Sequence, residues 1–345
     1  MFWKLRAFLL ENTTISQTIT KNTIWLLLGQ LLSRLMRAAL VVYAARLLGA
    51  ESWGAFSYAL GVATFLTVFS DIGLSVFLTR EAARHQNLRD QYLATAFFIK
   101  LGLIVIIVLG VIIFFPYLTK IEEAALIMPI LIFLFIFDTL RDLGLALSRA
   151  LERMQIEAGV QIFANFIIVT LGFILLNQST TGRSLAWAYA SGSALGLIAI
   201  FYALRLRLKD IFKNFNRSLI KPMLVSAWPF GLLGLTGVIM LNTDIIMLGW
   251  LKSPAEVGYY SAAQKLIQLL YVLPTILATS LFPMMARLIR NEPTLVKNTL
   301  EKSVALVIMI AVPLAIVGIL FGGPIIKLLF GAEYLPSILT FQILM

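Results

Sequence analysis

The stretch Glu51-Ser-Trp-Gly54-Ala-Phe-Ser57 returns later in the chain as Ala255-Glu-Val-Gly258-Tyr-Tyr-Ser261. The glycines and the last serines of the two copies coincide at a shift of 204 residues. Ahead of them, Arg46–Gly49 and Ile246–Gly249 extend the match across a small gap. Such self-similarity is the signature of an internal repeat. The sequence therefore predicts two related halves.

The composition excludes most soluble proteins. Of 345 residues, 60% are apolar and 13% are charged, whereas an ordinary soluble domain is about a quarter charged. A soluble fold cannot hide so much apolar surface from water. The absence of Cys and the single His exclude disulfides, Cys-containing zinc sites and His-rich metal sites. An all-α, polytopic membrane protein remains.

Apolar runs long enough to cross a bilayer core of about 30 Å divide the chain. Nine are complete, at 22–48, 54–78, 92–115, 124–147, 158–177, 184–204, 223–250, 257–281 and 303–321. We expect residues 1–21 to be an interfacial segment, 22–204 an N-lobe of six spans, 205–221 a basic cytoplasmic linker, and 222–345 a C-lobe truncated within span 10. Six spans separate the repeat copies, so both lobes have the same orientation, with a substrate site expected between them.

Basic residues are strongly unequal between the two sides. Alternate loops carry 19 Lys and Arg on one side and five on the other, so the positive-inside rule places the amino terminus in the cytoplasm. This asymmetry explains the net charge of +11 without a nucleic-acid partner. On a helical wheel, residues 204–221 separate into an apolar and a basic face, which predicts an interfacial helix on anionic lipid. A solvated linker is the alternative.

Charges inside predicted spans are expensive and usually face a partner or a wet cavity. Arg34 and Arg37 lie one turn apart in span 1 and share a face with Gln30. Guanidinium groups bind phosphate bidentately and stay charged, so we expect them to bind a pyrophosphate. Ion pairs with Asp71 or Asp244 are the structural alternative.

Polar side chains form a stripe on two spans at the same phase of the repeat. The residues are Ser57, Thr64, Thr67, Asp71 and Ser75 on span 2, and Ser261, Gln264, Lys265, Gln268, Thr275 and Thr279 on span 8. We interpret the stripes as walls of a hydrated cavity in which Lys265 and Gln268 help to hold the anion. Asp244 and Asp71 are candidates for Na⁺ or H⁺ coupling. Lys100 is close enough to the inner boundary to snorkel, and we interpret it as a structural residue.

No catalytic motif accompanies these charges. The outward loops are short, and no Walker-A loop, GxSxG, HExxH or GxGxxG pattern occurs. We therefore expect no enzyme activity, no metal and no cofactor, apart from a coupling ion.

Several segments resemble polysaccharide flippases, the O-antigen and teichuronic-type exporters of the multidrug/oligosaccharidyl-lipid/polysaccharide superfamily. The segments are Ala45–Gly54, Asp71–Leu74, Thr79–Arg84, Trp228-Pro229, Asp244–Gly249, Val257–Tyr260, Pro274 and Leu281–Pro283. The resemblance implies a prokaryotic cell-membrane protein that flips polyprenyl-pyrophosphate-linked glycan to the outer leaflet by alternating access. Glycan polymerase or assembly proteins would then be further partners. A multidrug antiporter of the same superfamily and a non-transporting scaffold of a glycan-assembly complex are the competing hypotheses.

Overall fold

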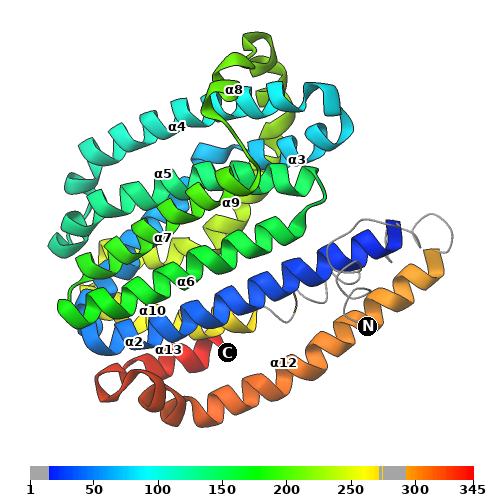
Figure 1. Cartoon of the computed structure of the whole chain (residues 1–345). Helices are drawn as coiled ribbons and strands as arrows, with labels where there is room; N and C mark the ends of the chain where they lie inside the picture. Colours follow the sequence, from blue (N-terminus) through cyan, green and yellow to red (C-terminus); the bar gives the residue numbers. More distant parts are fainter. Residues whose placement is uncertain (1–14, 272–273, 275–292) are drawn as a thin grey trace.

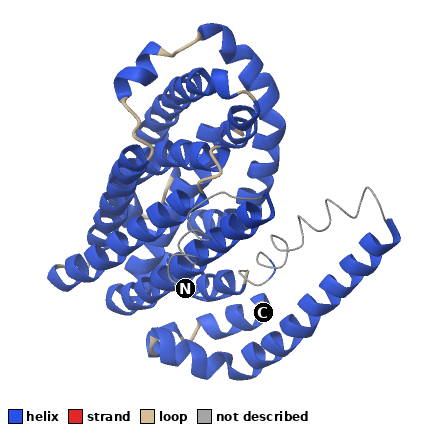
Figure 2. Cartoon of the chain, turned by 45° about the vertical axis from the view of Figure 1, so that its right-hand side comes forward, coloured by secondary structure: helices blue, strands red, loops and turns tan. Residues whose placement is uncertain are grey.

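The computed structural model describes residues 15–271, 274 and 293–345 of the chain. Every regular element in these residues is helical, as Figures 1 and 2 show, so the predicted all-α fold is confirmed. The helices are α2 (Ile15–Asp71), α3 (Leu74–Arg84), α4 (Arg89–Leu118), α5 (Glu122–Ala150), α6 (Met154–Gln178), α7 (Gly182–Ala203), α8 (Leu208–Lys213), α9 (Ile220–Leu251), α10 (Pro254–Leu270), α12 (Pro293–Phe330) and α13 (Ser337–Leu344). Short 3-10 turns cover Gln86–Leu88, Arg217–Leu219 and Ala332–Tyr334.

Seven helices in the described ranges are long and apolar enough to cross a membrane, which supports the predicted multi-pass protein. The sequence predicts nine complete spans, and part of the difference arises because α2 (Ile15–Asp71) contains the span 22–48 and most of the span 54–78. The predicted eighth span extends past α10 into residues that lie outside the described part. Thr275, Thr279 and residues 1–14 of the predicted interfacial segment lie outside it as well.

Two glycines bend the first pair of spans. Gly49, with φ of 73°, interrupts the helical conformation within α2, and a positive φ suits glycine because it has no Cβ. Gly73, with φ of 79°, follows Ile72, whose φ is 44°. The predicted span 54–78 is therefore broken at residues 72–73, which the apolar run alone could not indicate.

The molecule has two ends that carry different turns. One, here called the hairpin end, holds the Gly49 bend and the α4–α5, α6–α7, α9–α10 and α12–α13 connections (Figure 1). At this end the Glu333 carboxylate accepts the Ala50 N–H at 2.7 Å, and the Ser52 hydroxyl donates to Glu123. The opposite end, here called the basic end, holds the segment from α7 to α9.

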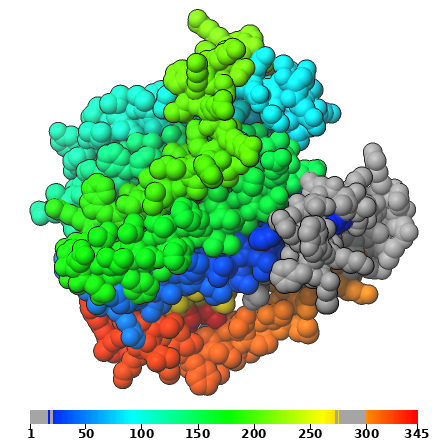
Figure 3. Space-filling view, in the orientation of Figure 1, coloured from blue at the N-terminus to red at the C-terminus, as the bar shows by residue number. Residues whose placement is uncertain are grey.

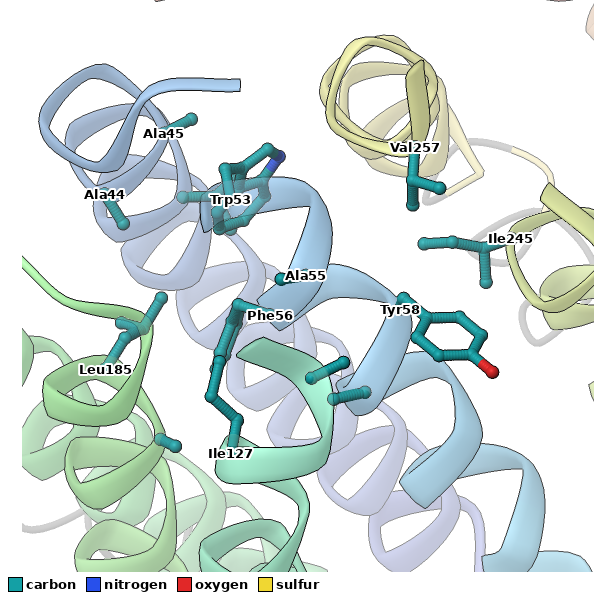
Figure 4. Close-up of a cluster of buried hydrophobic side chains, with 14 of the residues drawn as sticks. Ala44, Ala45, Trp53, Ala55, Phe56, Tyr58, Ile127, Leu185, Ile245 and Val257 are labelled. Atoms are coloured by element: carbon teal, nitrogen blue, oxygen red, sulfur yellow. The ribbon is translucent and has the colours of Figure 1, made fainter. Parts of the chain in front are cut away.

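An apolar core joins the predicted N-lobe (22–204) and C-lobe (222–345), here simply called the lobes, near the hairpin end. Trp53, Phe56 and Tyr58 of α2 are at most 1% exposed. In Figure 4, Phe56 lies between Leu185 and Ile127 of the N-lobe, whereas Tyr58 faces Ile245 of α9. Burial of a large side chain of this kind contributes about 1.5–3 kcal/mol.

The repeated glycines bring the lobes into backbone contact at the hairpin end. A methyl group on Gly54 would lie 1.8 Å from the Pro254 carbonyl oxygen, and one on Gly258 would lie 1.9 Å from the Ala50 carbonyl oxygen. Only glycine permits such an approach. Gly73 immediately precedes α3, and a methyl group on it would lie 2.3 Å from the Ala227 carbonyl oxygen of α9. The lobes therefore also touch toward the basic end.

Polar contacts reinforce the junction at the hairpin end. The Arg46 side chain donates from Nε to the Leu329 carbonyl at 2.5 Å and from Nη2 to the Leu328 carbonyl. The buried Tyr334 hydroxyl donates to the Ala45 carbonyl at 2.9 Å. Together with the Glu333–Ala50 bond and the Gly54–Gly258 approach, these contacts form what is here called the hairpin-end clamp. Figure 3 shows α12 and α13 gathered along the edge of the molecule beside α2.

The predicted amphipathic helix over 204–221 is wrong in its extent. Helix α8 covers Leu208–Lys213 alone, and α7 ends before it at Ala203. Ile211 is buried, and the rings of Phe212 and Phe215 lie 5.1 and 4.9 Å from the ring of Phe98 on α4. Part of the apolar face thus packs on protein rather than on lipid, a competition that a helical wheel does not represent.

Candidate functional site

A cavity of about 370 Å³ lies between the lobes. Its walls come from both halves of α2 and from α5, α7, α9 and α10. The polar side chains in the described part of the lining are Arg34, Arg37, Ser57, Thr64, Asp138, Tyr189, Asn242, Gln264, Lys265, Gln268 and Tyr271. Both repeat halves therefore contribute polar groups to one space at the depth of the spans.

Arg34 and Arg37 reach this cavity from the first half of α2. The Arg37 Nε donates to Asn165 Oδ1 on α6 at 3.0 Å, and its guanidinium carbon lies 5.2 Å from the centre of the Tyr189 ring. Asn165 donates in turn to the Gln161 carbonyl at 2.8 Å, which fixes its amide with the oxygen toward Arg37. Among the residues that the structure describes, the other two Arg37 nitrogens have no hydrogen-bond partner.

No acidic side chain pairs with these arginines in the part of the chain that the structure describes: its ion pairs involve neither of them. The structural alternative, ion pairs with Asp71 or Asp244, therefore finds no support there. Asp138, the one carboxylate in the described lining, lies 2.9 Å from Arg141 on its own helix. The cavity thus keeps a cationic excess.

Lys265 and Gln268 face the same cavity from α10. The Lys265 Nζ donates to Gln268 Oε1 at 3.3 Å. Arg37 lines the same cavity from α2. Two lobes therefore direct three cations at one volume, which suits a ligand with more than one negative charge.

Asp244 lies behind the wall rather than in it. Its Oδ2 accepts a hydrogen bond from Gln264 Nε2 at 2.8 Å and another from the Tyr260 hydroxyl. Gln264 lines the cavity, so the amide connects the carboxylate to the site. The carboxylate is satisfied by neutral donors and takes part in none of the described ion pairs.

Asp71 does not reach the cavity. Its Oδ1 lies 2.5 Å from Lys100 Nζ, and it also accepts the Ser75 hydroxyl at 2.6 Å. Lys100 is completely buried and donates further to the Thr139 carbonyl at 3.3 Å. The prediction that Lys100 snorkels is therefore wrong, because an acidic partner on α2 makes burial of its charge tolerable.

Only part of the polar stripe on the second span faces the cavity. Ser57 and Thr64 line the cavity, whereas Asp71 and Ser75 belong to the ion-pair network at the break between α2 and α3. The Thr67 hydroxyl bonds the Thr64 carbonyl of its own helix at 2.6 Å. Gln30 is half-buried and is absent from the described lining.

Two residues that contact Arg37 could not be identified from the sequence. Tyr189 and Asn165 stand in runs of small or apolar residues, and nothing in their spacing marks them as partners of Arg37. Asp138 pairs with Arg141 on its own helix and also lines the cavity. Within the described residues, no cluster of three or more His, Cys, Asp or Glu could hold a metal ion.

Residues 19–289 match the family described as "Polysaccharide biosynthesis protein". A protein of Shigella flexneri named "Putative O-antigen transporter" is 23% identical over 95% of this chain and 80% of its own length. A protein of Haloferax volcanii named as a low-salt glycan biosynthesis flippase is 22% identical over 85% of this chain and 61% of its own length.

Solved transporters share the fold. An outward-facing multidrug resistance MATE family transporter of the MOP superfamily superposes with a TM-score of 0.65 at 16% identity, over 98% of this chain and 79% of the other. A MOP superfamily transporter from Pyrococcus furiosus, whose title reports a binding pocket of reverse polarity, gives a TM-score of 0.63 at 16% identity, over 96% and 77% of the two chains. Because the family match covers most of its length, the chain belongs to the family of polysaccharide biosynthesis proteins.

Proposed function

We propose that this chain moves polyprenyl-pyrophosphate-linked oligosaccharide from the cytoplasmic to the outer leaflet of a prokaryotic cell membrane, for cell-surface polysaccharide biosynthesis. It does so as a transporter rather than as an enzyme. The amino terminus and the basic end face the cytoplasm, as the distribution of Lys and Arg indicates. Glycan polymerase or assembly proteins would receive the product.

The cationic excess of the cavity carries this proposal. Three cations at membrane depth are costly unless they serve a function, and a pyrophosphate carries the complementary charge. Arg34, Arg37 and Lys265 would hold it, with Gln268 bonded to the lysine. A cationic drug would be repelled by the same groups, which disfavours the multidrug antiporter hypothesis.

The size of the cavity supports a headgroup rather than a whole glycan. A volume of about 370 Å³ equals roughly a dozen water molecules at about 30 Å³ each. That space accepts a pyrophosphate but not an oligosaccharide as well. The lobes must therefore separate for the glycan to pass, while the polyprenyl tail stays in lipid.

Alternating access gives the hairpin-end clamp a role. In our proposal the clamp closes the outer face while substrate enters from the cytoplasmic side. Release outward requires the Arg46, Glu333 and Tyr334 bonds to break and the Gly54–Gly258 backbones to part. Each neutral hydrogen bond of this kind contributes about 0.5–1.5 kcal/mol, so a few of them make a closure that binding energy can reverse.

We propose Asp244 as the group that couples movement to H⁺ or Na⁺. Its carboxylate accepts a hydrogen bond from Gln264, which lines the cavity beside Lys265. Protonation or cation binding there would change the charge that Lys265 experiences. Asp71 is a weaker candidate because Lys100 already neutralises it.

The test is to replace both arginines, as Arg34→Gln and Arg37→Gln, and to measure binding of farnesyl pyrophosphate together with surface glycan. A charge-assisted hydrogen bond is worth about 1.5–3 kcal/mol, and about 1.4 kcal/mol is a factor of ten. We expect each substitution to weaken binding roughly ten- to hundred-fold and the double variant to abolish export.

Arg183→Gln is the matched control, because this exposed arginine is outside the described cavity lining. It should leave binding and export unchanged. Normal export by the double variant, at normal abundance in the membrane, would refute the site and favour the scaffold hypothesis. Drug resistance that depends on the chain while surface glycan is normal would favour the antiporter.

A further inference from the structure

A groove of about 850 Å³ lies on the N-lobe, away from the cavity between the lobes. Phe97 of α4, Leu140 of α5 and Leu197 and Phe201 of α7 line it. Ile198 and Tyr202, on the same stretch of α7, are 62% and 86% exposed. In a membrane protein, exposed apolar side chains on a long helix face lipid, so the groove opens toward the bilayer.

The groove continues into a polar pocket of about 200 Å³ at the basic end, and the two share Arg205, Leu206 and Arg207. Arg89, Asp90 and Asp210 also line the polar pocket. Arg89 pairs with the adjacent Asp90 at 3.2 Å. Arg205 and Arg207 take part in none of the described ion pairs, and they outnumber the remaining Asp210. In Figure 3 this linker forms the light green protrusion beside α3 and α4.

Arg205 is held in a backbone conformation that normally selects glycine. Its φ is 53°. It follows α7 in the turn where its N–H donates to the Tyr202 carbonyl at 3.1 Å and the Leu206 N–H donates to the Phe201 carbonyl at 2.9 Å. Glycine is the usual residue at this position of a helix terminus, and strain of this kind collects at functional sites.

We propose that this place binds one anionic glycerophospholipid, with its phosphate between Arg205 and Arg207 and an acyl chain in the groove. The charge excess matches a negative headgroup, and an apolar groove joined to a cationic pocket at a membrane boundary matches an amphiphile. A ligand of about this size suits a cavity of this volume. The lipid would be a resident of the N-lobe and is distinct from the transported substrate.

Such a lipid would fasten the linker between the lobes. The linker touches α4 through the Phe98 rings and through Asn216, which exchanges hydrogen bonds with Thr95, and it leads directly into α9. Helix α7 also carries Tyr189, which lines the transport cavity. The lipid would therefore hold together the elements that the lobes must keep in register.

The experiment measures lipid retained by the purified chain in native mass spectrometry, with dioleoyl phosphatidylglycerol or dioleoyl phosphatidylcholine as the probe. We expect the wild type to retain phosphatidylglycerol preferentially. Arg205→Gly should reduce that retention about ten-fold while the lipid-free protein melts at the same or a higher temperature, because glycine relieves the left-handed backbone. Arg207→Gln should also reduce it, and Leu197→Trp should block it by filling the groove.

Glu152→Gly is the matched control. Glu152 has φ of 56° in the same kind of turn after α5 but lines neither cavity, so its replacement should leave lipid retention unchanged. Equal retention of the two lipids, or wild-type retention by Arg205→Gly, would overturn the proposal. If glycerol phosphate displaced the bound phosphatidylglycerol, the pocket would be a site for free phosphate. If farnesyl pyrophosphate displaced it at low concentration, the pocket would belong to the entry path of the substrate.

Discussion

The buried Asp71–Lys100 pair gives a sharp test of what the acidic residue on the second span does. Lys100 is 0% exposed, and its Nζ has three oxygen neighbours, at 2.5 Å (Asp71), 3.0 Å (Ser75) and 3.3 Å (Thr139). The Asp71 side chain is 28% exposed and is also bonded by Ser75. We predict that Asp71→Asn is strongly destabilising, that Lys100→Met is less so, and that the double variant recovers most of the loss.

Asp71→Asn should destabilise the protein more than Lys100→Met because Lys100 is the more deeply buried partner. Removing one partner of a buried ion pair costs about 3–5 kcal/mol because the other charge is left uncompensated. Asp71→Asn leaves a fully buried ammonium and should cost that amount. Lys100→Met leaves a carboxylate that keeps partial access to solvent and the Ser75 hydroxyl, so we expect about 1–3 kcal/mol. Replacing both residues removes both charges and is often close to neutral, which implies a coupling energy of about 3 kcal/mol or more.

The assay is a double-mutant cycle on unfolding in mixed micelles, read together with surface glycan in cells. Lys120→Met removes a lysine from an exposed position and should change neither readout. If the double variant is as unstable as the sum of the single variants, the structural assignment of the pair fails. If Asp71→Asn folds stably, exports nothing and is not rescued by Lys100→Met, then Asp71 has a role in transport beyond the ion pair and our interpretation is refuted.

Two further substitutions test the clamp and the setting of Arg37. Gly258→Ala places a methyl group 1.9 Å from the Ala50 carbonyl oxygen, so the hairpin end cannot close and export should be lost; Gly234→Ala, with open space around its Cβ, should export normally. Tyr189→Leu removes the ring beside Arg37 and, at about 0.5–2 kcal/mol for a cation–π contact, should weaken farnesyl pyrophosphate binding roughly two- to thirty-fold. Tyr189→Phe should bind as the wild type, and equal losses in both variants would exclude the ring as the cause.

The membrane class and the convergence of the cations could be predicted because both depend on hydrophobicity along one helix. A charge buried in an apolar span must face something polar, and Arg34, Arg37, Lys265 and Gln268 do face one cavity. Their role in binding stays a prediction. Asp71 had the same signal in the sequence, yet it faces Lys100 on another helix. Sequence gives the depth of a residue in its span, whereas the partner depends on how the helices pack.

Local backbone geometry also could not be predicted from the sequence. The break at Ile72–Gly73 and the short extent of α8 both depend on contacts with distant elements: Gly73 approaches α9, and Phe212 approaches α4. A hydropathy run or a helical wheel treats each segment as if it were alone. Tyr189 and Asn165 could not be predicted for the same reason, because each contacts Arg37 from another helix.

The predicted internal repeat aligns each cation that lines the cavity with a glycine in the other copy. Gly54 and Gly258 are equivalent positions of the two copies, and they meet each other, as equivalent elements do near a pseudo-two-fold axis. At the same shift, Lys265 corresponds to Gly61, and both line the cavity. Across the small gap, at a shift of 200, Arg34 and Arg37 correspond to Gly234 and Gly237. Cations at equivalent positions close to the axis would repel each other across the space that they share.

Alignment of a long side chain with a glycine avoids that repulsion, and at Gly61, which lines the cavity, it also leaves room for a ligand. In our proposal both lobes supply charge to one cavity, so a doubly charged anion would be held by the two lobes together. The affinity for pyrophosphate would then depend on how far apart the lobes are. Separation of the lobes would lower the affinity for the anion, and a lower affinity in the outward-open state is what release on the far side of a membrane requires.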